Sequence, residues 1–302
     1  MKLSIKNLLF LIIAPLFFSF LSSAQTAPPP VTKIFLVDVA SHNGQMKLGQ
    51  PVKITTFEGY NNQPSFLPDG RSLFFTSIRE GQQADIYRYE LGNGSTVRVI
   101  STRESEFSPT VTPDSRFFSV VRVEADQTQR LWKFPVAGGE PLLVLQKIKP
   151  VGYHLWVDAH TLALFVLGTP NTLQMVDVAS ERTETIARDI GRSLRMIPHQ
   201  KKLSFVHKIS EQEWTIEAFD LKTRQTTTLI KTLPGSEDFV WTPRGEILMA
   251  HGAKIYRWNP ARDHDWQEIA DFSSAGISEI TRIAVSPNGS KIAFVAKQSG
   301  AH

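Results

Sequence analysis

The chain has 302 residues, of which 41% are hydrophobic and 21% charged, so it can bury one large core or two smaller ones. It has no cysteine, which excludes disulfides and thiolate metal sites. The formal net charge is +4, and the longest purely basic run after the N-terminal segment is Lys201-Lys202. Nucleic-acid binding normally needs a concentrated basic face, so we expect no nucleic-acid partner.

The N-terminal segment has the order of residues typical of a secretory signal. Lys2 and Lys6 precede an apolar run over residues 8–21, and Ser22-Ser23-Ala24 follows it. This order predicts a signal peptide over residues 1–24, cleaved after Ala24. The apolar run is shorter than the roughly 20 residues that a spanning helix needs. We therefore expect a periplasmic protein that does not span the membrane after cleavage. Residues 25–32, with three consecutive prolines, predict a stiff extended leader.

One short pattern recurs along residues 33–302: an extended stretch, often a proline, a polar turn, then an apolar run. Its clearest copies are Pro68-Asp69-Gly70 and Pro287-Asn288-Gly289, in which Asn and Gly suit tight hairpin turns. The third copy has lost the proline. The six equivalent positions, 41 to 45 residues apart, are Pro68, Pro113, Val157, Pro198, Pro243 and Pro287. This period in strand-rich sequence predicts four-stranded propeller blades.

The two ends of this region complement each other. The sixth repeat stops at Val295 after only two strands, while two further strands, Ile34–Val39 and Val52–Phe57, precede the first turn. Pairing the N-terminal strands with the C-terminal hairpin completes a sixth blade and leaves no unfinished blade. We therefore predict an all-β fold, a single six-bladed β-propeller over residues 33–302. Its ring is closed by Ile34–Val39 lying beside Ile292–Val295.

These repeats resemble the TolB-like propeller family, which is built from WD40-like repeats of the Pro-Asp type (PD40). The resemblance rests on residues 65–70, 86–89 and 285–294, and it extends over essentially the whole region after the leader. TolB itself carries an additional α/β domain before its propeller. Only about ten residues separate the expected cleavage site from the first strand, so we expect that domain to be absent here.

The sequence shows no catalytic machinery. Related propellers accompany hydrolase domains, but no Gly-x-Ser-x-Gly nucleophile motif occurs and no stretch remains to form such a domain. The eight histidines include no His-x-x-x-His pair. Asp263-His264-Asp265 is the densest group of ligand-type side chains, and we interpret it as a solvated turn. We predict no catalytic residue, no metal and no cofactor.

The central channel is the best candidate for a site, because the innermost strands of all blades converge there. Residues five before the repeat position are polar or small, and with two neighbours they provide the candidate binding residues. These are Gln63, Ser108, His154, Arg195, Asp238 and Arg282. Two interpretations stay open: a ligand pocket, or charges that satisfy one another around a water-filled hole, which we favour.

The sequence leaves two functions. The first is an exported, non-catalytic scaffold of the bacterial cell envelope that binds a partner protein or peptide at the channel face, as a monomer. The alternative is a propeller that binds a small molecule or glycan at a polar channel site, with lyase or hydrolase activity as one form of it.

Overall fold

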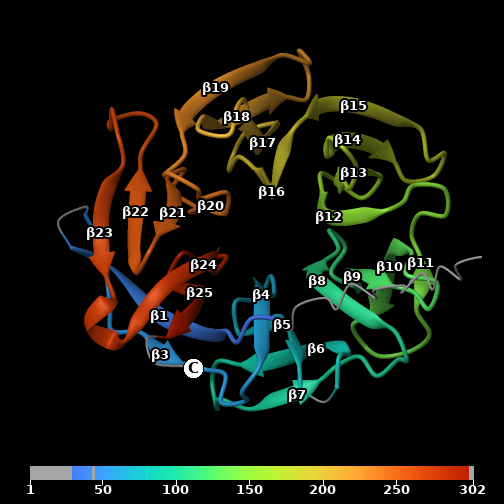
Figure 1. Cartoon of the computed structure of the whole chain (residues 1–302), viewed down its shortest axis with the longest axis horizontal. Helices are drawn as coiled ribbons and strands as arrows, with labels where there is room; N and C mark the ends of the chain where they lie inside the picture. Colours follow the sequence, from blue (N-terminus) through green and yellow to red (C-terminus); the bar gives the residue numbers. More distant parts are fainter. Residues whose placement is uncertain (1–28, 43–44, 80, 299–302) are drawn as a thin grey trace, which may run out of the picture.

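The computed structural model describes residues 29–42, 45–79 and 81–298. Over these residues the chain forms six antiparallel β-sheets arranged as blades around a central axis (Figure 1). The prediction of a six-bladed, all-β propeller is therefore confirmed. No helix in this part of the chain is long and apolar enough to cross a membrane. The expected signal peptide and residues 25–28 of the expected leader lie outside the described residues.

Each blade runs from an inner strand at the axis to an outer strand at the rim (Figure 1). Blades 1 to 5 follow the chain order, and blade 6 combines strands from both ends of the described chain. A short 3-10 turn, η1 (Ser273–Ala275), precedes β24. The strands are: blade 1, β4 (Tyr60–Phe66), β5 (Ser72–Ile78), β6 (Ala84–Glu90) and β7 (Thr96–Arg98); blade 2, β8 (Ser105–Val111), β9 (Phe117–Val123), β10 (Gln129–Pro135) and β11 (Leu142–Leu143); blade 3, β12 (Val151–Trp156), β13 (Thr161–Val166), β14 (Thr172–Asp177) and β15 (Thr183–Arg188); blade 4, β16 (Ile190–Met196), β17 (Lys202–Lys208), β18 (Trp214–Asp220) and β19 (Thr226–Lys231); blade 5, β20 (Phe239–Trp241), β21 (Ile247–His251), β22 (Lys254–Trp258) and β23 (Gln267–Asp271); blade 6, β24 (Ile277–Val285), β25 (Lys291–Gln298), β1 (Lys33–His42), β2 (Gln45–Leu48) and β3 (Val52–Lys53).

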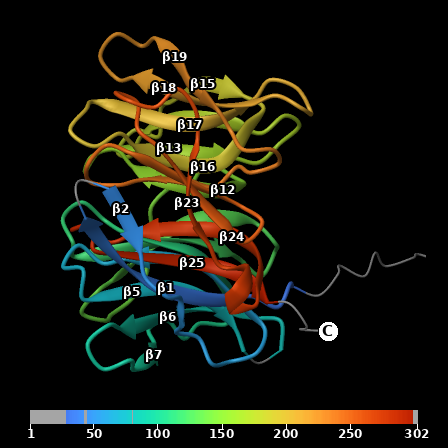
Figure 2. The same cartoon turned by 90° about the vertical axis from the view of Figure 1, so that its left-hand side faces the viewer.

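The ring closes through β1 and β25, as predicted. The two strands pair antiparallel, with Ile34 opposite Val295 and Val37 opposite Ile292. Figure 2 shows β24, β25 and β1 side by side at this closure. Because β1 and β25 pair with each other, neither leaves an unpaired edge at the point where the ring closes.

The second N-terminal strand differs from the prediction. Instead of one strand over residues 52–57, the outer edge of blade 6 consists of two short pieces, β2 and β3, which both pair with β1. Gly49, Gln50 and Pro51 separate them. A proline has no N–H to give to a strand ladder, so the edge is interrupted there.

Apolar side chains fill the spaces between neighbouring blades. Phe205, in blade 4, packs in one cluster with residues of blade 3, while Phe239 of blade 5 packs with Val206 and Ile216 of blade 4. Phe294 in β25 is completely buried and stacks on Phe35 and Phe272. Because each blade buries its faces against its neighbours, the ring positions its inner strands firmly.

The third repeat is offset by one residue from the sequence alignment. The first hairpin turn closes with a backbone bond from Thr112 N–H to Phe117 O in blade 2 and from Val157 N–H to Thr161 O in blade 3. Val157 thus matches Thr112, the residue before the proline, and Asp158 is the true equivalent of Pro113. The choice of Val157 as the repeat position was wrong, because this turn lacks the proline that marks the others.

Two tryptophans support the corrected alignment. With Asp158 as the repeat position, Trp156 and Trp241 become equivalent residues. The indole N–H of Trp156 donates to Ser119 Oγ at 2.9 Å, and that of Trp241 donates to Ser204 Oγ at 2.8 Å. Both serines belong to the second strand of the preceding blade. The same inter-blade contact therefore repeats in two places.

Candidate functional site

The six residues predicted from the sequence as a site, Gln63, Ser108, His154, Arg195, Asp238 and Arg282, all line one cavity of about 260 Å³ on the channel axis, here called the narrow chamber. Whether they bind anything stays a prediction.

Bulges in the inner strands explain how these side chains reach the axis. The pairing of β4 with β5 shifts register between Asn62 and Ser65, and that of β8 with β9 shifts between Phe107 and Thr110. Gln63 and Ser108 lie inside these bulges with positive φ values of 57° and 55°. A bulge inserts one residue and turns its side chain away from the regular alternation. The residue five before the repeat position is thereby presented at the axis.

Three of the residues that lie five before a repeat position also join neighbouring blades. The side-chain oxygen of Gln63 accepts the Ser108 backbone N–H at 2.9 Å, and Asp238 Oδ1 accepts the Ile283 N–H at 3.2 Å. Ser193 Oγ accepts the Phe239 N–H at 3.3 Å. Each bond satisfies a buried or partly buried backbone donor of the next blade. Part of the predicted polar set therefore has a structural role.

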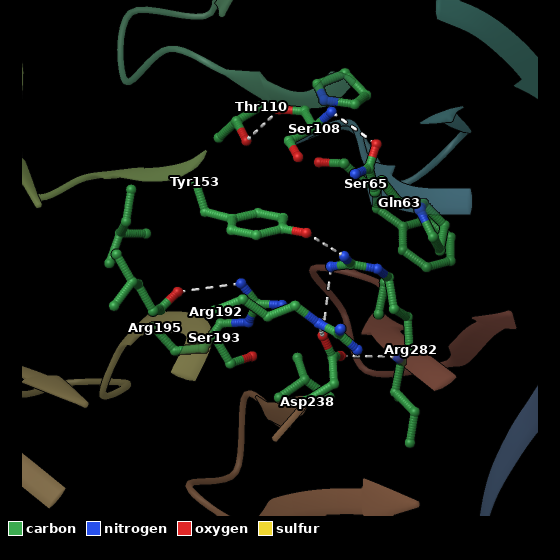
Figure 3. Close-up of a pocket in the computed structure, with 18 of the residues that line it drawn as sticks. Gln63, Ser65, Ser108, Thr110, Tyr153, Arg192, Ser193, Arg195, Asp238 and Arg282 are labelled. Atoms are coloured by element: carbon green, nitrogen blue, oxygen red, sulfur yellow. Dashed lines mark hydrogen bonds and ion pairs between the residues drawn. The ribbon is translucent and has the colours of Figure 1, made fainter. Parts of the chain in front are cut away.

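A group of four side chains narrows the channel and is called the constriction: Tyr153, Arg192, Asp238 and Arg282. The Arg282 guanidinium donates to the Tyr153 hydroxyl at 2.7 Å and to Asp238 Oδ2 at 3.5 Å, and Figure 3 shows it between these two partners. Arg192 Nε lies 3.7 Å from the same Asp238 oxygen. Burial opposes the charge of Arg282, but Tyr153 and Asp238 outweigh burial and raise its pKa. Within the constriction, the one carboxylate of Asp238 therefore faces two guanidinium groups.

The constriction separates the narrow chamber from a second, larger cavity of about 910 Å³, here called the wide recess. All four constriction residues line both cavities. The wall of the wide recess includes residues 234–238 before β20, residues 250–252 at the turn from β21 to β22, and residues 278–283 of β24. Thr32, at the end of the expected leader, is also part of its wall and is fixed by a bond from its hydroxyl to Asn61 O at 2.9 Å.

Charges of both signs line the wide recess. Arg192 Nη1 lies 3.2 Å from Glu237, and Lys208 binds the other oxygen of that carboxylate at 2.9 Å. Burial alone would raise the pKa of Glu237, but the two cations together lower it. Glu279 and Lys297 form a half-exposed pair at 2.6 Å. Burial raises the pKa of the partly buried Tyr60 hydroxyl to about 12, so this hydroxyl stays protonated.

The narrow chamber contains two residues with unusual electrostatics. His154 is 8% exposed, its Nε2 lies 2.6 Å from Ser119 Oγ, and burial lowers its pKa to about 3. Its ring is therefore neutral at physiological pH. Arg195 donates to the carbonyl of Leu194 at 3.1 Å, and burial lowers its pKa. No carboxylate of the described residues lies within ion-pair distance of this guanidinium.

The sequence analysis missed Tyr153, Arg192 and Glu237. Tyr153 was hidden by the offset of the third repeat: counting five back from Asp158 gives Tyr153, whereas counting from Val157 gave Gly152. Arg192 and Glu237 both lie six before their repeat prolines, one step outside the position considered. The corrected hairpin alignment would have revealed the first, and a search of the adjacent position the other two.

The ligand-type side chains do not gather into a metal centre. Among residues 29–42, 45–79 and 81–298, no group of three or more His, Asp or Glu side chains is placed to hold a metal ion. In the Asp263-His264-Asp265 segment, the Asp263 carboxylate binds Arg257 at 3.2 Å and the Asn259 N–H at 2.8 Å. Asp263 thus organises its own turn.

No protein-family model matches the chain, and no curated protein matches its sequence. Solved structures do resemble its fold. A putative TolB from Agrobacterium tumefaciens gives a TM-score of 0.67 at 15% identity, over 88% of this chain and 98% of that one. TolB from Acinetobacter baumannii gives 0.57 at 12% identity, over 91% of this chain and 66% of that one. The present chain thus spans just under two thirds of the latter protein.

A third similar structure is an oligogalacturonate lyase in complex with manganese, with a TM-score of 0.51 and 12% identity over 91% of this chain and 99% of that one. At such identities the likeness concerns the fold. The chain has the fold of the TolB-like six-bladed propellers; the finer assignment to PD40 repeats has no matching family model.

Proposed function

We propose that the protein is an exported, non-catalytic propeller of the bacterial cell envelope, monomeric by itself, that docks a partner protein or peptide at the mouth of its channel. Export follows from the signal peptide expected over residues 1–24. The fold shared with TolB structures agrees with a role in binding.

The wide recess is the observation that carries this proposal. It has a volume of about 910 Å³ and ends at a constriction whose side chains are held by one another. A protein or peptide segment can enter such a recess without crossing the channel. Charges of both signs at its wall, Glu279 and Lys297 among them, supply the complementarity that fixes the orientation of a partner.

Charge reversal in the recess tests the proposal. The mature protein is immobilised and exposed to envelope extract. The binding of a partner recovered in stoichiometric amount is then compared between the wild type and the Glu279→Lys variant. Glu184→Lys is the matched control, because Glu184 also pairs with a basic residue, Arg224, but lies on β15 at the rim of blade 3. We expect at least a tenfold weaker interaction for Glu279→Lys and no change for Glu184→Lys. Equal capture by both variants would refute docking in the recess.

A second function, binding of a small molecule in the channel, is favoured by one specific observation. The Arg195 guanidinium lines the narrow chamber without a carboxylate partner among the described residues. The resemblance to an oligogalacturonate lyase makes a glycan one candidate class. We propose no catalysis, because Ser119, the serine that His154 contacts, is completely buried, and its hydroxyl also bonds the Thr110 carbonyl and the Trp156 indole.

A further inference from the structure

The narrow chamber holds more positive than negative charge. Of the lysine, arginine, aspartate and glutamate side chains in its wall, three are arginines, Arg192, Arg195 and Arg282, and one is the carboxylate of Asp238. Arg282 is paired with Asp238, and Arg192 is paired with both Asp238 and Glu237. One guanidinium charge, that of Arg195, remains without a counter-charge among the described residues.

An uncompensated cation in a partly desolvated cavity is costly. Charged groups away from water are normally paired, since burial alone disfavours the charged form. Arg195 shows this effect: burial lowers its pKa, and the nearby Arg282 lowers it further, while Asp238 only partly opposes them. Its one hydrogen bond goes to the neutral carbonyl of Leu194. An anion entering the chamber would supply the missing counter-charge.

A carboxylate fits this vacant interaction. The planar guanidinium presents a fork of donors that matches a carboxylate in a bidentate arrangement. The hydroxyl of Ser65 also lines the chamber and can donate a further hydrogen bond, whereas that of Thr110 already donates to the Ser108 carbonyl at 3.4 Å (Figure 3). A volume of about 260 Å³ admits a small acid or the end of a peptide.

We infer that the narrow chamber is a carboxylate-binding site centred on Arg195, for the carboxylate of a free small organic acid or of a peptide C-terminus. This goes beyond docking in the wide recess, because the constriction lies between the two cavities. The second candidate function stated above, small-molecule binding, is made specific by it.

Calorimetric titration of the mature protein tests the inference. The probes are acetate, succinate and lactate, with acetamide as the neutral analogue, inorganic phosphate, and a short alanine peptide with either a free or an amidated C-terminus. We expect carboxylates to bind and acetamide not to bind. A free-acid peptide that binds more tightly than the small acids would identify a peptide as the source of the carboxylate, and the reverse order would identify a free acid.

Two variants locate the interaction. Arg195→Gln removes the charge and is expected to weaken carboxylate binding at least tenfold, while Arg195→Lys, which keeps the charge but not the fork, weakens it less. Arg116→Gln is the matched control, because the Arg116 side chain is 78% exposed on a turn. We expect Arg195→Gln to melt no lower than the wild type, since it removes an unpaired charge.

Three results would overturn the inference: no carboxylate binding at millimolar concentration, equal binding by acetate and acetamide, or a preference for phosphate. If Arg195→Gln did not fold, the acetate–acetamide comparison on the wild type would still decide. Failure here would leave docking in the wide recess intact, because that proposal is measured with Glu279→Lys.

Discussion

Replacing Asp238 by alanine probes the constriction directly. Its carboxylate is 7% exposed, accepts the Ile283 N–H, and faces the guanidinium groups of Arg282 and Arg192. Removing one partner of a buried ion pair typically costs about 3–5 kcal/mol, because the other charge stays buried. Arg282 keeps its bond to the Tyr153 hydroxyl, so we expect a loss near the lower end, about 3 kcal/mol.

Urea unfolding, followed by the fluorescence of the six tryptophans, measures this loss. Asp238→Asn retains an acceptor for the Ile283 N–H and should lose about 1 kcal/mol less than the alanine variant. The control is Asp38→Ala, because Asp38 pairs with Lys291 at the surface and is 79% exposed. Such exposed pairs contribute about 0–1 kcal/mol.

A double variant separates charge from shape. Asp238→Ala combined with Arg282→Met should be more stable than the sum of the two single losses predicts, since no unpaired charge then remains between them. A loss below about 1 kcal/mol for Asp238→Ala would refute the reasoning, because it would mean that the charges of the constriction do not depend on one another. The expected loss also shows that Asp238→Ala is a poor test of ligand contact: weaker binding in that variant would not separate a lost contact from a disturbed channel.

Three further predictions concern the core and two buried groups. Phe294→Ala should destabilise the protein by about 3–5 kcal/mol, because Phe294 is fully buried between Phe35 and Phe272 at the ring closure; urea unfolding that shows less than 1 kcal/mol would contradict this packing. Burial raises the pKa of Glu106 to about 7 from 4.5, so the stability associated with its protonated form is present below pH 4.5 and is lost as the pH rises through 7. Stability curves should therefore show the wild type losing roughly 3 kcal/mol relative to Glu106→Gln across this window, and parallel curves would contradict it. Burial lowers the pKa of His154 to about 3 from 6.5, so its ring resonances in NMR spectra should not titrate between pH 5 and 8; an inflection near 6.5 would show a solvated ring.

The architecture could be predicted because its signals are local and repeated. Turn residues such as Pro68-Asp69-Gly70 recur at a nearly constant period, and they determine where the first hairpin of each blade turns. Where the turn chemistry changed, at Val157 and Asp158, the alignment slipped by one residue. The slip was enough to replace Tyr153 by Gly152 in the expected channel lining.

The candidate site could be predicted only in part. The position five before each turn did indicate residues that reach the axis, since Gln63, Ser108, Asp238 and Arg282 lie there and line the narrow chamber together with their predicted neighbours His154 and Arg195. The pairing of the charges depends on bulges and on contacts between blades that are distant in sequence, such as Arg282 with Tyr153. The alternation of apolar and polar residues along a strand carries no information about such bulges and contacts. For this reason Arg195, one member of a larger polar set in the sequence, becomes distinct only when the ion pairs around it are known.

The pairing of β1 with β25 has a consequence for how the chain folds. Lys33 lies opposite Ala296, so blade 6 combines the first and last strands of the described residues, and β1 is synthesised long before β25. Contacts between such distant segments carry a high entropic cost of loop closure and slow the folding of β-rich proteins. Until residues 291–298 are available, β1 has no inner neighbour in its sheet, and the unfinished ring exposes strand edges that can aggregate. The chain is therefore vulnerable to aggregation until the ring closes, and shielding of β1 during synthesis would protect it at that stage.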